Sequence, residues 1–216
     1  MPRKAIGLLD CPVEVLELIS TYFCSHCTHI APWRYFEDGT ANLLNLSSTC
    51  KQLCRATQPT LFHVFNSWYK PPEQSAVPFL RSLIGCPDLR NAVREVAYGH
   101  EWSPEDVLYI NTAVSDLDVI RFLHQWEHED SADKLLGLLL SVTPGVTAIR
   151  STALRALPAS SHTHAPMLPK LRELQLEGTN DLKELIQLLP QVPNLETLLV
   201  YHLNSSLSLD VVGRLF

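Results

Sequence analysis

Apolar residues near the N-terminus recur every three or four positions, which is the spacing of one face of an α-helix. The pattern predicts a helix over residues 12–23, with Pro12 at its first position and Asp10 as a cap just upstream. The apolar face of this helix comprises Val15, Leu16, Ile19, Tyr22 and Phe23.

Two more short helices are expected before the polar stretch that follows Phe65. One contains the apolar cluster at residues 43–46, and the next is capped by residues 47–49 and ends at Pro59. Three short helices bury little apolar surface by themselves, so a domain of this size is marginal unless a partner covers part of it. The N-terminal part is therefore predicted to be a docking module.

A different pattern of hydrophobic positions occupies the second half of the chain. Leu171 lies 25 residues after Val146, and Leu195 lies 24 residues after Leu171. Each begins a segment of the form Φ-x-x-Φ-x-Φ and follows a proline and one further residue, although the last position of the first segment is Ser151. Helical stretches are expected at residues 133–142 and 181–189. Residues 93–98 fit the same strand template.

A strand and a helix repeated with this period are typical of leucine-rich repeats. The apolar residues of one strand stack on those of the next, and the positions between them point out of the concave face. We expect that face to bind a protein target. The candidate target-binding residues are Glu173, Gln175, Glu177, Thr197, Leu199 and Tyr201. The last repeat is incomplete, which indicates a truncated solenoid.

The N-terminal segments CPVEVLELIS and NLLNLSSTCKQLCRATQPTLF resemble the two halves of an F-box. The residues that fit the family motif are Pro12, Val15, Leu16, Ile19, Leu43, Leu44, Leu46, Thr49, Cys50, Lys51, Leu53, Leu61 and Phe62. The sequence departs from the family at Cys11, where leucine is usual, and in the long connection between residues 23 and 43.

The resemblance implies binding to the Skp-type adaptor of a Skp–cullin–F-box ubiquitin ligase. The adaptor-binding or adaptor-supporting residues it implies are Pro12, Leu16, Ile19, Leu43, Leu44, Leu46, Leu53 and Phe62. A Leu16→Asp substitution is expected to abolish docking, because it places a charge in an apolar interface.

The order of the segments is similar to that of fungal F-box/leucine-rich-repeat proteins. The expected fold class is α+β multidomain, with a small all-α three-helix F-box followed by an α/β leucine-rich-repeat solenoid of irregular repeats. The expected boundaries are an F-box over residues 8–68, a connector over 69–92 and the repeats over 93–216. The function this implies is substrate recognition for a ubiquitin ligase; the alternative is a non-catalytic repeat scaffold with no ubiquitin role.

Charge and composition limit the classes of molecule that we expect the protein to bind. The 216 residues include 17 basic and 23 acidic side chains, which give a formal charge of −6. This balance disfavours nucleic acid and anionic membranes as partners. The longest strongly apolar run, residues 135–142, is too short to span a bilayer, and the N-terminus lacks a secretory pattern. We expect a cytoplasmic or nuclear protein whose six cysteines are reduced.

The sequence offers little support for catalysis. Its eight glycines are never closer than eight residues apart, which excludes the usual phosphate-binding loops and nucleophile elbows. His124 and His128 with Glu127 match the zinc-protease pattern H-x-x-E-H, but a third ligand is not evident. We expect a non-enzyme without cofactors.

A structural zinc site is the second metal hypothesis. Its candidate ligands are Cys24, His26, Cys27, His29, Cys50 and Cys54. Because the F-box motif uses Cys50 for packing, no metal is expected here.

Overall fold

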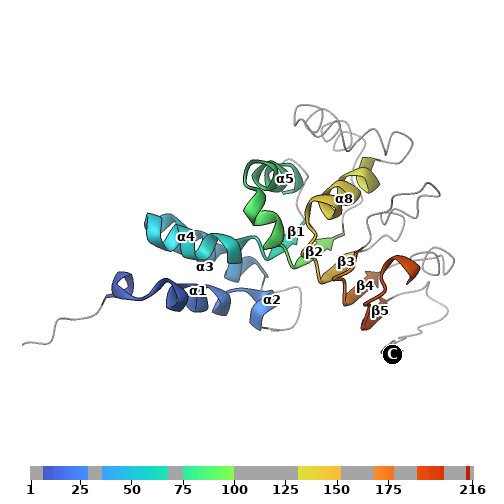
Figure 1. Cartoon of the computed structure of the whole chain (residues 1–216), viewed down its shortest axis with the longest axis horizontal. Helices are drawn as coiled ribbons and strands as arrows, with labels where there is room; N and C mark the ends of the chain where they lie inside the picture. The colour runs from blue at the N-terminus through green and yellow to red at the C-terminus, as the bar shows by residue number, and fades with distance from the viewer. Residues whose placement is uncertain are drawn as a thin grey trace, which may run out of the picture. The chain divides into compact units, whose positions relative to one another are not determined.

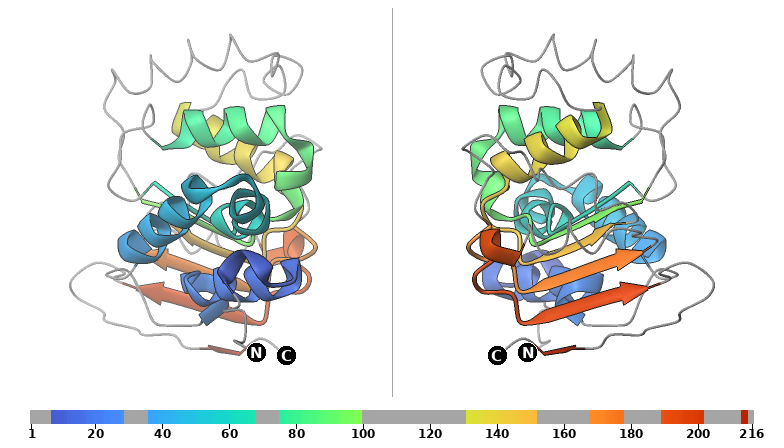
Figure 2. Two further views of the ribbon diagram at one scale, coloured as in Figure 1. Left: turned by 90° about the vertical axis from the view of Figure 1, so that its left-hand side faces the viewer. Right: turned by 90° about the vertical axis from the view of Figure 1, so that its right-hand side faces the viewer.

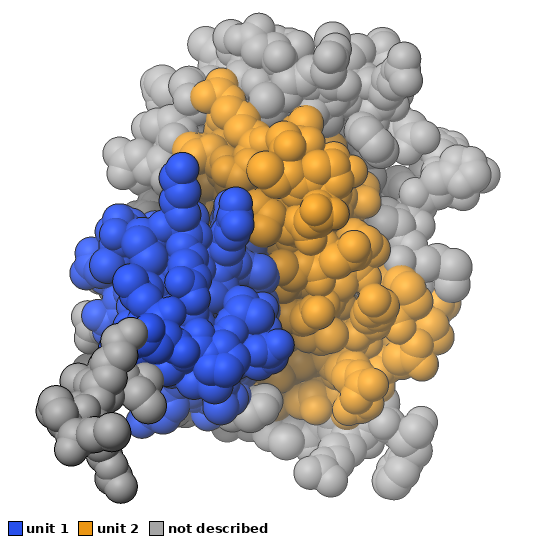
Figure 3. Space-filling view, turned by 60° about the vertical axis from the view of Figure 1, so that its left-hand side comes forward, with its two compact units in different colours: residues 1–64 blue, residues 65–216 orange. Residues whose placement is uncertain are grey.

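The computed structural model describes residues 7–28, 36–67, 75–99, 131–151, 168–177, 189–201 and 213–214. The chain divides into two compact units, residues 1–64 (unit 1) and residues 65–216 (unit 2), which Figure 3 distinguishes by colour. It combines helices with a largely parallel sheet, so the mixed α and β character expected from the sequence is confirmed (Figure 1).

The described elements of unit 1 are helical up to its last residue. They are η1 (Leu8–Asp10), α1 (Val13–Tyr22), α2 (Ser25–Thr28), α3 (Phe36–Thr49) and α4 (Lys51–Leu61). Helix α1 confirms the first predicted helix, but its start differs from the prediction. Pro12 is the N-cap residue rather than the first helical residue, and the Asp10 carboxylate accepts the Gly7 N–H at 2.9 Å, so it caps η1 instead.

The boundary between α3 and α4 also differs from the prediction. Residues 47–49 close α3 rather than cap α4: the Ser47 hydroxyl donates to the Leu44 carbonyl at 2.8 Å. Such back-bonding to the preceding turn satisfies the hydroxyl inside a helix. Pro59 does not end α4, which continues to Leu61, because a proline in the last turn costs only one backbone hydrogen bond.

The core of unit 1 forms where α1 meets α4. Leu16, Leu53 and Ala56 are fully buried there, and Cys11, Ile19, Leu46 and Cys50 pack against them. Helix α3 comes close to the end of α1 at Gly39, where a Cβ atom would collide with the Phe23 carbonyl oxygen. Among the described residues of unit 1, Cys24 and Leu43 are buried as well.

Unit 2 contains nearly all of a sheet with the order β1-β2-β3-β4-β5-β6. Its strands are β1 (Val64–Asn66, which begins at the unit boundary), β2 (Glu95–Tyr98), β3 (Ala148–Ser151), β4 (Glu173–Glu177), β5 (Thr197–Tyr201) and β6 (Gly213–Arg214). Strands β2 to β5 are parallel and lie side by side, whereas β6 pairs antiparallel with β5 (Figure 2). All four predicted strand segments are confirmed.

Helices α5 (Ala76–Gly85) and α8 (Ser131–Val142) lie against each other in unit 2 (Figure 2). Helix α8 confirms the helix predicted at residues 133–142. The predicted connector contains α5 and the short helix η2 (Pro87–Asn91), and η5 (Leu189–Gln191) precedes β5. The helix predicted at residues 181–189 lies almost wholly outside the described residues.

The period in the sequence corresponds to a period in the hydrogen bonds. The Arg94 carbonyl accepts the Thr147 and Ala148 N–H groups at 2.7 and 3.0 Å. The Thr147 carbonyl accepts those of Arg172 and Glu173 at 2.8 and 3.0 Å, and the Arg172 carbonyl accepts those of Glu196 and Thr197, both at 2.8 Å. Equivalent residues therefore make equivalent contacts from strand to strand.

The same regularity places the apolar side chains in two buried rows. Val96, Ile149 and Leu174 are level with one another in the register, and each is fully buried. Leu176 is level with Val200, and both are also buried. These rows belong to the core of unit 2, and each row is made of residues from more than one strand.

In the described residues, no helix is long and apolar enough to cross a membrane.

Candidate docking surface and sheet face

Helix α1 carries apolar side chains both toward the core of unit 1 and toward solvent. Leu16, 1% exposed, faces the core of unit 1, and Ile19 is half-buried against the same core. Val15, Leu18 and Tyr22 are 40%, 70% and 77% exposed. Because they are spaced i, i+3 and i+7, they form one stripe along the helix, here called the outer stripe.

Other exposed apolar residues lie in the same unit. Across the described ranges, all large hydrophobic side chains that are exposed fall between Leu8 and Leu44. Besides the outer stripe they are Leu8, Leu9, Val13 and Leu44. A single exposed leucine is ordinary on a protein surface, but a concentration of them in one small unit is typical of a protein-interaction surface.

The residues assigned to adaptor binding from the sequence fall into three groups by exposure. Pro12 and Leu44 are exposed, whereas Ile19, Leu46 and Phe62 are half-buried. The buried members are Leu16, Leu43 and Leu53. The buried residues belong to the interior of unit 1, so they support a surface rather than form one.

The loss of docking expected for Leu16→Asp stays a prediction, but the structure changes its physical reason. The Leu16 side chain lies in the core of unit 1, where a charge would disrupt folding before it disrupted an interface. Leu18 was not among the predicted adaptor-binding residues, although its spacing indicates a helical stripe: it lies three residues after Val15 and four before Tyr22.

The candidate target-binding residues of the sheet are less open than expected. Gln175 is buried at 5% exposure, while Glu173, Thr197 and Leu199 are half-buried. Glu177 and Tyr201 lie in β4 and β5, and their side chains fall outside the described residues. Gln175 therefore does not form part of an open surface, whereas the three half-buried residues remain within reach of a partner.

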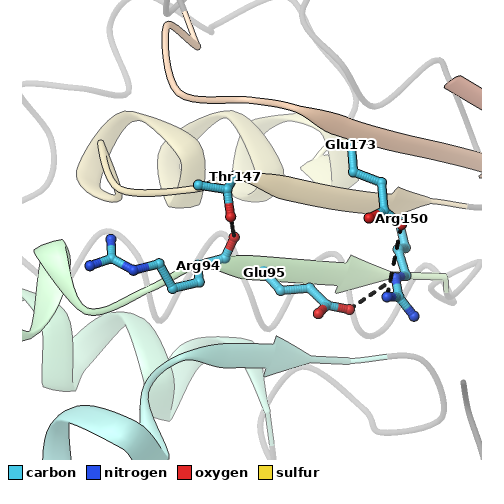
Figure 4. Close-up of polar contacts among 5 residues, drawn as sticks. All are labelled: Arg94, Glu95, Thr147, Arg150 and Glu173. Atoms are coloured by element: carbon cyan, nitrogen blue, oxygen red, sulfur yellow. Dashed lines mark hydrogen bonds and ion pairs between the residues drawn. The ribbon is translucent and has the colours of Figure 1, made fainter. Parts of the chain in front are cut away.

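Three charged side chains meet on this sheet (Figure 4). Arg150 Nε lies 2.9 Å from Glu95 Oε1, and Arg150 Nη2 lies 4.0 Å from Glu173 Oε1. Burial raises the pKa of the Glu95 carboxyl, Arg150 opposes this, and the neighbouring carboxylate of Glu173 adds to it. The trio therefore brings charged side chains of β2, β3 and β4 together on one face of the sheet.

A pocket of about 480 Å³ lies at the turns that precede β3, β4 and β5. Its lining includes the exposed ion pair between Arg172 Nη1 and Glu196 Oε1, at 3.3 Å, and the Asn194 amide, which donates to the Pro169 carbonyl at 2.6 Å. Its lining contains no cysteine, histidine or serine, and its one hydroxyl, on Thr147, donates to the Arg94 carbonyl at 3.1 Å.

The metal hypotheses have different outcomes. The H-x-x-E-H motif and His29 lie outside the described residues. Cys50 packs against the core of unit 1. Cys24, His26 and Cys27 lie close to a fourth residue, His63. His63 was not a predicted ligand, because it is 36 residues from Cys27 in the sequence.

The chain was compared with protein-family models, with curated proteins and with solved structures, and none of the three comparisons found a match.

Proposed function

We propose that this protein is a non-catalytic substrate-recognition subunit of a Skp–cullin–F-box ubiquitin ligase. In this proposal unit 1 is an F-box that docks on the Skp-type adaptor, and the parallel strands of unit 2 belong to leucine-rich repeats that hold a protein target. The outer stripe of α1 is the observation that carries the proposal.

Three large side chains in the outer stripe are exposed on a helix whose other face already fills the core of unit 1. Exposed apolar area costs free energy in water, and burial against a partner recovers roughly 25 cal/mol per Å². The stripe also lies in the helix that resembles the first helix of an F-box. Sequence resemblance and exposure therefore point to the same element.

The repeated strands support the second half of the proposal. Strands β2 to β5 make the same backbone contacts to one another, and most of their apolar residues are buried. Such stacks present a long sheet face that suits the binding of an extended protein surface. Half-buried Glu173 and Thr197, level with each other in the register, are the candidates for contact.

The test is co-expression with a fungal Skp-type adaptor, followed by size-exclusion chromatography of wild type and Leu18→Asp. We expect a one-to-one complex for the wild type and a loss of adaptor binding of at least about tenfold for the variant, since a charge would enter an apolar interface. Leu18 is 70% exposed, so the substitution should leave the thermal stability of the free chain unchanged.

Arg55→Gln is the matched control. It changes the net charge by the same amount at an exposed position of α4, and it should bind the adaptor like wild type. A folded wild-type chain that forms no complex would contradict the proposal and favour the repeat scaffold without a ubiquitin role. Equal binding by Leu18→Asp would exclude the outer stripe as the docking surface.

A further inference from the structure

Four side chains with metal-binding chemistry converge in unit 1, at the ends of two helices. The ligand atoms of Cys24, His26, Cys27 and His63 all lie within 4.8 Å of one another. Cys24 Sγ lies 3.7 Å from His63 Nδ1, Cys27 Sγ lies 3.2 Å from the same nitrogen, and Cys27 Sγ lies 3.8 Å from His26 Nδ1. The described residues contain no second group of this kind.

The backbone explains why the four residues meet. Helix α1 ends at Tyr22, and the single turn of α2 follows at once. The Cys24 carbonyl accepts both the N–H and the hydroxyl of Thr28 at 3.0 Å, which holds this turn closed. His63 follows the end of α4, and its N–H donates to the Thr60 carbonyl at 3.1 Å. Because α1 packs on α4, their two ends are brought together.

The observed separations fit the geometry of tetrahedral zinc. Zinc binds thiolate sulfur at about 2.3 Å and imidazole nitrogen at about 2.0–2.1 Å, so neighbouring ligand atoms of a tetrahedron are about 3.4–3.8 Å apart. The three distances of 3.2, 3.7 and 3.8 Å require only small side-chain adjustments to reach that range. Two sulfur and two nitrogen ligands are a donor set that selects zinc.

Burial is also suited to a structural site. Cys24 is 4% exposed, and the other three residues are half-buried, so the ligands are shielded from bulk water but accessible to an ion. Two thiolates balance the charge of a divalent cation, and the two imidazoles bind in their neutral form. Four protein ligands leave no open position for a substrate, which is typical of structural rather than catalytic zinc.

We propose that unit 1 binds one Zn²⁺ through Cys24, His26, Cys27 and His63. The ion ties the turn after α1 to the end of α4, across 36 to 39 residues of sequence. Binding displaces one proton from each thiol. The site cross-links two segments of unit 1, and the energy of metal binding adds to the stability of the folded state. The proposal does not depend on adaptor binding, so either can fail alone.

The test begins with the wild-type chain purified under reducing conditions, whose zinc content is measured by elemental mass spectrometry. Cobalt is then substituted for zinc, because tetrahedral Co²⁺ with thiolate ligands has characteristic visible and charge-transfer absorption. We expect one equivalent of zinc per chain and a cobalt spectrum of two thiolates. Cys27→Ser and His63→Ala should lose at least tenfold in zinc affinity, whereas His63→Cys should retain the metal and add a third thiolate to the spectrum.

Cys54→Ala is the matched control, because it removes a half-buried thiol of unit 1 that is not part of the group. A second measurement needs no variant: half-buried Cys27 should become alkylated in wild type only after a chelator is added, while exposed Cys86 reacts either way. A wild-type chain that takes up no zinc or cobalt would overturn the proposal. Undiminished zinc affinity in His63→Ala, or alkylation of Cys27 at the same rate with and without the chelator, would also overturn it.

Discussion

Gly145 illustrates how one residue can be constrained by its neighbours rather than by its own backbone. Residues 145, 170 and 194 occupy equivalent places in the turns before β3, β4 and β5, and the other two are lysine and asparagine. A Cβ atom at residue 145 would lie 2.9 Å from the backbone oxygens of both Asn91 and Val93. Glycine is therefore required only in this turn, because η2 ends beside it.

Gly145→Ala should lower the free energy of unfolding by about 1–3 kcal/mol, since two backbone oxygens must move to admit the methyl group. Chemical denaturation monitored by circular dichroism measures the change. Gly85→Ala is the control, because a Cβ there meets nothing within 4 Å. A loss at Gly145 no larger than at Gly85 would contradict the close approach of η2.

Glu95 should make stability depend on pH in a defined direction. Burial raises its pKa above the ordinary value of 4.5, so the folded state holds the proton more tightly than the unfolded state. The tighter binding of this proton stabilises the folded state below pH 4.5, and the stabilisation is lost as the pH rises through the pKa of Glu95 in the folded state. The stability of Glu95→Gln relative to wild type should therefore increase toward neutral pH.

Denaturation of both proteins over a series of pH values provides the measurement. Glu196→Gln, at a carboxylate whose side chain is 63% exposed, controls for the loss of a surface charge. The opposite trend for Glu95→Gln would mean that the attraction to Arg150 outweighs burial.

At the scale of the element, α1 contributes apolar side chains both to the core of unit 1 and to its exposed surface. The inner face contributes to the packing of unit 1 through Leu16, and the outer stripe leaves Leu18 and Tyr22 in solvent. The helical period predicted where the helix lies. It did not separate the two faces, because both carry large apolar residues.

Leu16→Ala and Leu18→Ala should therefore differ in their effect on stability. Leu16→Ala should cost about 2–5 kcal/mol because it leaves a cavity in the core, whereas Leu18→Ala should stay within about 0.5 kcal/mol of wild type. Thermal and urea unfolding of the free chain measure both. Similar losses at the two positions would show that Leu18 is covered in the folded chain.

At the scale of the molecule, the two units have different sources of stability. Unit 2 is built on a sheet whose buried rows extend over β2 to β5. Unit 1 has a helical core between α1 and α4 and the proposed zinc ligands. Removal of an ion from one unit should affect local opening in that unit first.

Hydrogen exchange before and after treatment with a chelator tests this distribution. Amides of α1, α2 and α4 should exchange faster once zinc is removed, while those of β3 and β4 should be unchanged. An equal increase in the strands would show that the two units unfold together. An unchanged pattern in α1 and α4 would mean that the ion contributes nothing to the stability of unit 1.

The sequence by itself determined where most of the described elements lie. The helical spacing at residues 12–23 and the 24- to 25-residue period of Φ-x-x-Φ-x-Φ segments both correspond to elements of the structure. The patterns within each helix and strand are local signals, because the periods of 3.6 and 2 residues follow from backbone geometry alone. The equal spacing of the strand segments also predicted that they would align side by side.

Only the tertiary structure decided which of these residues are buried and which meet. It placed Leu16 in a core and Leu18 in solvent, covered Gln175, and brought His63 to Cys24 and Cys27. Burial depends on what packs against a side chain, and a metal site depends on where two helices end in space. Neither property can be derived from the spacing of residues along the chain. For this reason the candidate zinc ligands were only partly identified from the sequence.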